Sequence, residues 1–197
     1  ILRQRQENFI LKSIIVVSDG SRDRTADEAK GIGDEKVLVI EHKHREGKAI
    51  RQNEIVDIFN EDVLILMDAD VLPKDNMFLE KLLTPFKFKK NIGLVGCKSV
   101  PLKSKTFFGR IMNFSIDMKT RMIRKYNRGA NIYTCSGYAR AFSKDFIKKV
   151  RWPATVGEDA YSYLLCRKLG FEYVYQDAAG ILFSPPHNHG IASSSRA

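Results

Sequence analysis

The sequence lacks any apolar segment long enough to cross a membrane, and it lacks the cysteine patterns of cross-linked or zinc-binding domains. No apolar run approaches the ~18 residues that a spanning helix needs, and we expect no secretory signal peptide. The three cysteines, Cys97, Cys135 and Cys166, are an odd number without C-x-x-C spacing. We therefore expect reduced thiols in a cytoplasmic protein, with neither a disulfide framework nor a zinc site.

Internal repeats, low-complexity blocks and linkers are also missing, so we expect one domain over residues 1–190. The 197 residues, 44% of them hydrophobic, suffice for one α/β domain with a substantial core. Residues 191–197 have the composition of a tail, and the lack of an initiator methionine predicts truncation at both ends.

Acidic residues are fewer than basic ones. The 33 lysines and arginines against 23 aspartates and glutamates give a net charge of +10. This excess favours phosphorylated ligands, nucleic acid or an anionic membrane surface, and it does not choose among them.

One apolar run ends abruptly in two carboxylates. Residues 63–67 (VLILM) are typical of a buried strand, and Asp68-Ala69-Asp70 follows directly. Ligands of open α/β sheets bind at the carboxyl ends of strands, where two nearby carboxylates repel each other unless a cation neutralises them. Oxygen ligands suit Mg²⁺ or Mn²⁺, with substrate phosphates completing the shell. The alternative is that both acids only cap a helix or form a turn.

Strand and helix patterns alternate in the first third of the chain, which predicts a parallel sheet with right-handed crossovers. Polar loops follow the first two strands, and Thr25 and Glu28 have the spacing of a capping box. The segment before them, 1–12, is closer to a helix pattern than to a strand pattern. The expected strands are 13–17, 36–40, 63–67, 92–96, 171–175 and 181–183, and the expected helices start near 25, 49, 74, 106, 142 and 158.

The segment 106–126 is a basic amphipathic helix by its pattern. Phe107, Ile111, Phe114, Met118 and Met122 recur at helical spacing among five arginines and lysines. Such a stripe is either the core face of a surface helix or a contact with an anionic membrane, and the pattern leaves both open.

Taken together, the polar clusters at strand ends and helix starts resemble the nucleotide-sugar-dependent glycosyltransferases of family 2 over roughly residues 13–184. The matching segments are 16–25 (VVSDGSRDRT), 47–53 (GKAIRQN), 67–70 (MDAD), 135–137 (CSG) and 157–159 (GED). The resemblance implies the GT-A fold, a Rossmann-like, mixed and mainly parallel sheet flanked by helices. It also implies a role in cell-envelope or polysaccharide biosynthesis.

The resemblance further implies roles for single residues. Asp159 matches the catalytic base, which predicts inversion at the anomeric carbon, and Asp70 together with Asp68 matches the ligands of Mg²⁺ or Mn²⁺. The implied contacts with the nucleotide-sugar donor, a UDP-sugar by expectation, are Asp19, Ser21, Lys48, Asp68, Ser136, Gly137 and Glu158. The acceptor would be a carbohydrate or a lipid-linked molecule. Apart from the resemblance, the basic amphipathic helix over 107–122, or flanking segments outside this sequence, would provide peripheral contact with the cytoplasmic face of a membrane.

The sequence also departs from that family. Ser18 stands where the family often has a first acid, the strand preceding the Asp19 unit is missing or truncated, and no Q-x-x-R-W motif follows Asp159. His187 and His189 could add a metal ligand or belong to a solvated tail.

Several alternatives have specific weaknesses. A nucleotidyltransferase would need a glycine-rich loop near the N-terminus, and an aspartate-based phosphatase would need small residues where Val71 and Leu72 stand. A non-catalytic module that binds nucleic acid or an anionic surface would explain the net charge, but acids at successive strand ends repel phosphate, so no nucleic-acid partner is expected. An inactive fragment with the motifs of the fold is the remaining alternative.

Overall fold

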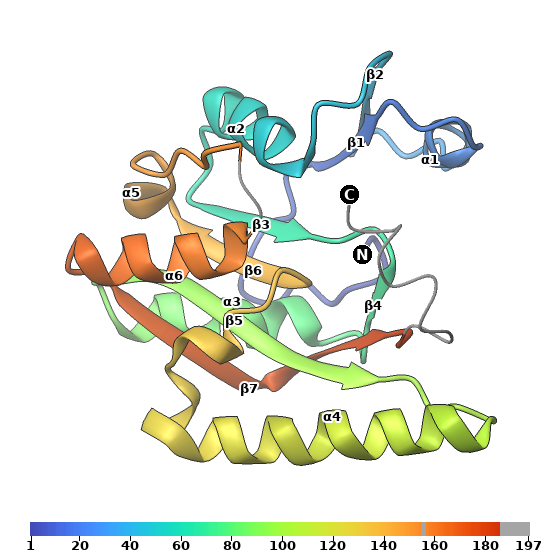
Figure 1. Cartoon of the computed structure of the whole chain (residues 1–197). Coiled ribbons are helices and arrows are strands. Elements are labelled where there is room, and N and C mark those ends of the chain that lie inside the picture. Colours follow the sequence, from blue (N-terminus) through green and yellow to red (C-terminus); the bar gives the residue numbers. More distant parts are fainter. Residues whose placement is uncertain (155–156, 186–197) are drawn as a thin grey trace.

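The computed structural model describes residues 1–154 and 157–185, which form helices packed against β-strands (Figure 1). The strands are β1 (Ile14–Asp19), β2 (Val37–His42), β3 (Val63–Met67), β4 (Val71–Pro73), β5 (Ile92–Pro101), β6 (Ala139–Ser143) and β7 (Glu172–Phe183). The α-helices are α1 (Thr25–Lys30), α2 (Lys48–Ile58), α3 (Phe78–Phe88), α4 (Phe107–Lys125), α5 (Lys144–Ile147) and α6 (Glu158–Lys168). Two 3₁₀ helices, η1 (Tyr126–Gly129) and η2 (Ile132–Thr134), follow α4.

The described strands form two sheets instead of one. β1 and β2 pair in parallel, and the other five lie in the order β3-β6-β5-β7-β4. In this larger sheet β5 and β7 are parallel, whereas the β3–β6, β5–β6 and β4–β7 pairs are antiparallel. The predicted mixed α/β architecture is therefore confirmed, but parallel pairing does not dominate it. The alternation of the first three strands predicted parallel neighbours, and β3 instead pairs with a strand from much later in the chain.

The three residues Asp68–Asp70 connect β3 and β4, which lie at opposite edges of the five-stranded sheet. The Asp68 N–H donates to the Tyr138 carbonyl (2.9 Å), just before β6. β7 can reach β4 because its pairing with β5 shifts register between Cys97 and Lys98, where residues 177–179 of β7 are extra. This bulge separates the two late strands that the sequence predicted, which here form one long strand. The connection that carries Asp68 and Asp70 therefore runs across the end of the sheet, from one edge strand to the other.

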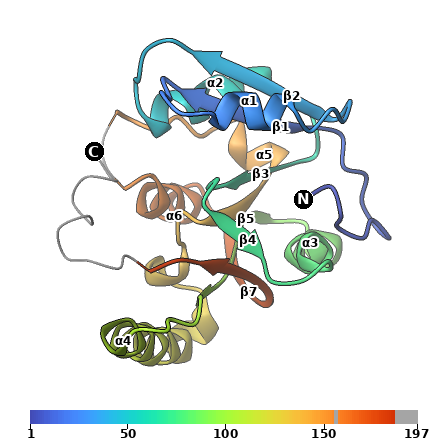
Figure 2. The same cartoon turned by 90° about the vertical axis from the view of Figure 1, so that its right-hand side faces the viewer.

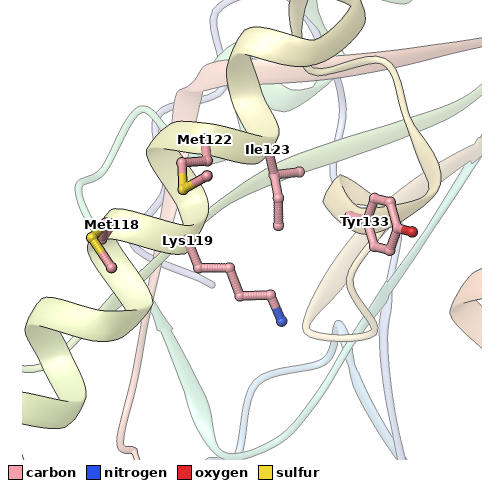
Figure 3. A pocket seen from close by; sticks show the side chains of 5 residues that line it. All are labelled: Met118, Lys119, Met122, Ile123 and Tyr133. Carbon is pink, nitrogen blue, oxygen red and sulfur yellow. The ribbon is translucent and has the colours of Figure 1, made fainter.

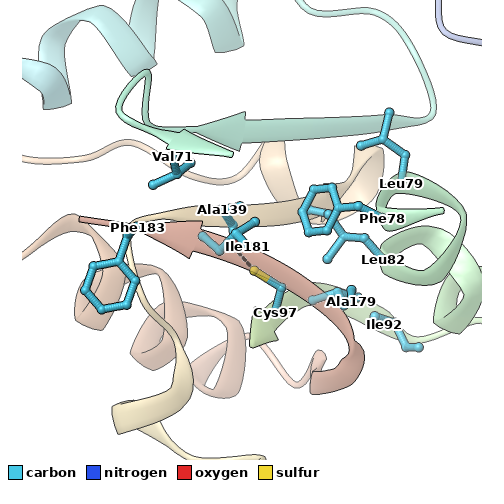
Figure 4. Packing of buried hydrophobic residues seen from close by; sticks show 12 residues of the cluster. Val71, Phe78, Leu79, Leu82, Ile92, Cys97, Ala139, Ala179, Ile181 and Phe183 are labelled. Carbon is cyan, nitrogen blue, oxygen red and sulfur yellow. Dashed lines mark hydrogen bonds between the residues drawn. The ribbon is translucent and has the colours of Figure 1, made fainter. Parts of the chain in front are cut away.

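Helices cover both faces of the larger sheet (Figure 2). Phe78 and Leu82 of α3 pack with Ile92 and Ile181 on one face (Figure 4). On the other face, α5 and α6 bury a second cluster that includes Phe142, Phe146 and Trp152. Two packed faces hold β6 between them, so the sheet end that carries Asp68 and Gly137 has rigid support.

Three local predictions are wrong. Residues 1–12 form turns and no helix, because Glu80 of α3 accepts the backbone N–H groups of Glu7 (2.6 Å) and Asn8 (2.7 Å). Thr25 does not cap α1; Asp23 accepts from the backbone N–H of Thr25 at 3.1 Å. The helix expected to start near 142 starts at Lys144 instead, since residues 142–143 belong to β6.

The helix predicted over 106–126 is confirmed as α4, which lies at the end of the molecule opposite β1 and β2 (Figures 1 and 2). Its apolar stripe is not a core face: Phe107 is 72% exposed and Phe114 is 68% exposed. Within residues 1–154 and 157–185, no helix has the length and apolar character that crossing a membrane requires.

Candidate functional site

The loop after β1 is held against the start of α2 by Asp19. Its carboxylate accepts the backbone N–H of Glu46 (3.0 Å) and of Gly47 (2.7 Å), and Arg51 Nε donates to it at 2.7 Å. Burial alone would raise the pKa of Asp19, but these hydrogen bonds outweigh it and the pKa lies below its ordinary value. Asp19 therefore orders the loop that precedes Lys48.

Gly20 allows the two loops to approach each other. Its φ is +66°, and a Cβ there would lie 2.7 Å from the backbone nitrogen of Arg45. Ser21, the next residue, is exposed, and its hydroxyl makes no hydrogen bond with the described residues. The contact of Asp19 and Ser21 with a nucleotide stays a prediction. In this structure the Asp19 carboxylate accepts hydrogen bonds from protein groups.

Lys48 links three elements at the centre of the site. It is the first residue of α2, and its Nζ lies 2.5 Å from Asp68 Oδ1, after β3, and 2.8 Å from Glu158 Oε1, the first residue of α6. An ammonium group between two carboxylates brings residues that are far apart in sequence to one point. Three segments that the sequence singled out separately, the loop at 47–48, the D-x-D segment and the start of α6, thus meet in the structure.

The charges of this triad follow from burial and pairing. Burial alone would lower the pKa of Lys48, but the two carboxylates raise it above its ordinary value, so the ammonium stays charged at neutral pH. For Glu158, burial raises the pKa and the hydrogen bond from Lys48 outweighs it, so the pKa is lowered. For Asp68, burial wins over Lys48, and the pKa is raised.

Gly137 lies against this triad. A Cβ at Gly137 would be 3.4 Å from Glu158 Oε1, 3.5 Å from Lys48 Nζ and 4.0 Å from Asp159 Oδ2. The absence of a side chain therefore leaves space directly beside the carboxylates. Ser136 Oγ instead shares a hydrogen bond with Ser99 Oγ of β5 at 3.2 Å, so this hydroxyl is partly committed to the protein.

Asp159 and Asp70 are the acids of the site without an ion pair among the described residues. Asp159 Oδ1 accepts the N–H of Ala160 (2.7 Å), and its Oδ2 faces Gly137. Asp70 is exposed, and its charge helps to raise the pKa of Asp68, which places the two carboxylates within electrostatic reach of each other.

A metal ion at the D-x-D segment would be held mainly by substrate oxygens. No group of three or more His, Cys, Asp or Glu side chains in residues 1–154 and 157–185 is arranged to hold a metal. Magnesium and manganese accept one or two carboxylates with phosphate and water in the remaining positions, and Asp70 with Asp68 fits that donor set. His187 and His189 lie outside the described residues.

The sequence analysis missed Arg140, which is fully buried in β6 below the site. Its Nη1 donates to the Glu158 carbonyl (3.0 Å) and to Ser162 Oγ (3.1 Å), whereas Nε and Nη2 have no hydrogen-bond partner among the described residues. Its positive charge lowers the pKa of both Asp68 and Glu158. A single arginine within the apolar run 139–142 was the available signal.

Asn53, in the family-matching segment 47–53, has a structural contact. Its side-chain amide donates to the Trp152 carbonyl (2.8 Å) and accepts the Trp152 N–H (3.0 Å). The indole of Trp152 in turn donates to Ser162 Oγ of α6 at 2.9 Å. These bonds tie α2 to α6 and thereby fix the distance between Lys48 and Glu158.

Comparison with known proteins gives the family and the fold. The model of the family described as Glycosyl transferase family 2 matches residues 1–151. The fold is similar to that of a mannosyltransferase from Pyrobaculum calidifontis in complex with GDP-Man and Mn²⁺, with a TM-score of 0.67, 17% identity and 93% of this chain covered. It is also similar to glucosyl-3-phosphoglycerate synthase from Mycobacterium tuberculosis in complex with Mg²⁺ and UDP, with a TM-score of 0.61, 18% identity and 91% covered.

The chain spans 51% of the length of the mannosyltransferase and 62% of that of the synthase. No curated protein matches it. At these identities, the likeness to the two structures shows a GT-A fold, and the assignment of the family rests on the family model.

Proposed function

This chain belongs to glycosyl transferase family 2, and we propose that it transfers a sugar from a nucleotide diphosphate to an acceptor hydroxyl, with a divalent cation and with inversion. A UDP-sugar is the expected donor, although the solved relatives include complexes with GDP-Man as well as UDP. The acceptor is a carbohydrate or a lipid-linked molecule, and the reaction takes place on the cytoplasmic side.

The convergence of Lys48, Asp68 and Glu158 carries this proposal. A donor diphosphate is rich in negative charge, so a site made of acids alone would repel it, whereas a charged ammonium among them attracts it. Lys48 can exchange a carboxylate for a phosphate oxygen when the donor binds, because its side chain is 43% exposed.

A bound Mg²⁺ or Mn²⁺ would neutralise the charge that develops on the nucleoside diphosphate as it leaves. Asp70, exposed and without an ion pair among the described residues, is the ligand that this role needs, and Asp68 beside it adds a second carboxylate or orders the water around the cation. We assign to the nucleoside the loop with Asp19 and Ser21, which lies at the end of β1 in the separate two-stranded sheet.

Asp159 is assigned as the base. It follows Glu158 at the first turn of α6, and its Oδ2 faces the space left by Gly137, where an acceptor hydroxyl can approach the donor sugar. The carboxylate would accept the proton of that hydroxyl as the oxygen attacks the anomeric carbon from the face opposite the leaving group. One direct displacement inverts the configuration.

Release of nucleoside diphosphate tests this proposal. The protein is incubated with Mn²⁺, a UDP-sugar or GDP-mannose, and a panel of saccharide and lipid-phosphate acceptors. We expect acceptor-stimulated release that falls by ~10²-fold or more in Asp159→Asn, as for the loss of a general base. Asp145→Asn is the matched control, because Asp145 is an exposed acid in the first turn of α5. Equal activity of wild type and Asp159→Asn would contradict the assignment of the base.

A further inference from the structure

The apolar stripe of α4 points away from the protein. Surface helices normally bury such a stripe, but here the side towards the protein carries Gly109, which is buried, and Ile116, which packs against the core. The outward side carries Phe107, Ile111, Phe114, Met118 and Met122, which are 46–72% exposed. The helix is therefore held with its most apolar side towards the surroundings, and nothing in the described residues covers it.

The charge around the stripe has one dominant sign. α4 contains five basic residues, Arg110, Lys119, Arg121, Arg124 and Lys125, and a single acid, Asp117. Arg110 and Lys119 lie on opposite flanks of the stripe by helical spacing, and both are exposed without an ion pair among the described residues. A surface with an apolar centre and basic flanks complements a bilayer whose head groups are anionic.

A pocket beside the stripe has the same character. It lies between α4 and η2, measures ≈ 370 Å³ and is lined almost entirely by apolar atoms of Met118, Lys119, Met122, Ile123 and Tyr133. Figure 3 shows Ile123 and Lys119 extending from α4 towards the side on which Tyr133 lies. An apolar lining of this kind favours an acyl chain over a polar ligand, and the Lys119 ammonium on its border carries a charge that attracts phosphate head groups.

The geometry points to one occupant for this face: we propose that α4 lies in the interface of an anionic lipid bilayer, with Phe107, Phe114, Met118 and Met122 inserted among the lipids. The helix carries too many charges to cross the membrane, so it would lie parallel to the surface. A second copy of the chain suits the face less well, because two copies would bring the same basic flanks together. η1 and η2 connect α4 to Ser136 and Gly137, so membrane contact would bring the site near lipid-linked acceptors.

Vesicle sedimentation tests this proposal without any substrate, so its outcome is independent of the proposed transfer reaction. The full chain is mixed with vesicles of phosphatidylcholine alone or of phosphatidylcholine with phosphatidylglycerol. We expect binding to the anionic vesicles that weakens as salt rises. The double variant Phe114→Asp with Met118→Asp should bind at least about tenfold more weakly, because two apolar insertions are lost. Arg110→Glu with Lys119→Glu should lose roughly fivefold for each basic residue removed.

Matched controls separate a local contact from general attraction by the net charge. Phe88→Asp with Ile58→Asp removes two apolar side chains elsewhere that are at least as exposed, and Lys90→Glu with Lys148→Glu makes the same change in net charge away from α4. Both controls should bind as wild type does. The proposal is overturned if anionic vesicles do not bind the protein or if the controls lose binding equally. It is also overturned if sedimentation equilibrium shows a dimer that only the α4 variants abolish.

Discussion

At the scale of single residues, the site depends on how Lys48 and Arg140 distribute positive charge. Lys48 pairs with Asp68 and Glu158 from the solvent side, and Arg140 lies below them and lowers the pKa of both. One cation is accessible to a phosphate, and the other is buried and fixed. When a substrate binds, Lys48 can move from Asp68 and Glu158 to the phosphate, and Arg140 stays in place beneath the two acids.

Arg140 is expected to serve the site at a cost in stability. Its Nε and Nη2 are buried without hydrogen-bond partners among the described residues. A buried guanidinium without these hydrogen bonds lowers the free energy of unfolding. Replacement by methionine leaves the Glu158 carbonyl with hydrogen-bond partners, because it still accepts from Trp152 Nε1 (3.2 Å) and Ser162 Oγ (2.5 Å). We expect Arg140→Met to be as stable as wild type or up to ~3 kcal/mol more stable, with weaker donor turnover.

Urea unfolding and turnover of the same preparations check this expectation, and Arg140→Lys serves as the control that keeps the charge. Retention of full turnover by Arg140→Met would remove Arg140 from the account of the site. A loss of several kcal/mol would show instead that the guanidinium stabilises the fold.

Sequence reasoning was effective for residues whose role follows from their place on an element. Asp68 and Asp70 follow an apolar strand, and Glu158 and Asp159 begin a helix. Their position at the end of the sheet where that strand terminates could therefore be predicted. The contact of Lys48 with two acids could not, because it depends on how α2, β3 and α6 pack together. Arg140 was missed because its burial follows from a strand pairing that the sequence does not state.

At the scale of elements, helical periodicity identified α4 but not its orientation. The spacing of Phe107, Phe114 and Met118 is the same whether the stripe faces a core or a membrane, and only packing against β5 and η1 decides which side is outward. The segment 1–12 shows the opposite case. Its local pattern predicted a helix, and contacts with α3 over a long sequence separation impose turns instead.

The attachment of this segment to α3 should depend on pH through Glu80. Burial alone would raise the pKa of Glu80, but the N–H groups of Asn8 and Glu7 lower it below 4.5, its ordinary value. A lowered pKa means that the ionised form is favoured in the folded state, so the stabilisation is present above about pH 4.5 and is lost as the pH falls through the folded pKa. Glu80→Gln should be less stable than wild type by roughly 2 kcal/mol at pH 7, and the difference should shrink towards pH 3.

Urea unfolding at both pH values measures this difference. Glu35→Gln is the matched control, because Glu35 is exposed and has no ion pair among the described residues. A difference between wild type and Glu80→Gln that stays constant from pH 7 to pH 3 would contradict the role of the Glu80 carboxylate.

At the scale of the whole molecule, the five-stranded sheet positions the site, and α4 forms the end opposite the β1–β2 pair. The sheet carries Asp68 and Gly137 at one end, supported by a packed layer on each face, and the β1–β2 pair holds the loop with Asp19 beside it. The class of fold followed from alternating strands and helices in the sequence. The division into two sheets did not, because it depends on the pairing of β3 with β6.

The central claim is that the cluster of Lys48, Asp68 and Asp70 binds a nucleoside diphosphate together with a divalent cation. Isothermal titration of UDP, and separately of GDP, into the full chain with and without Mn²⁺ tests it most directly, with Asp70→Ala as the variant and Asp145→Ala as the control. The account predicts that one nucleotide binds only with Mn²⁺, that Asp70→Ala abolishes this binding, and that Asp145→Ala leaves it unchanged. Failure of both nucleotides to bind the folded protein with Mn²⁺, or equal binding by Asp70→Ala, would contradict the account.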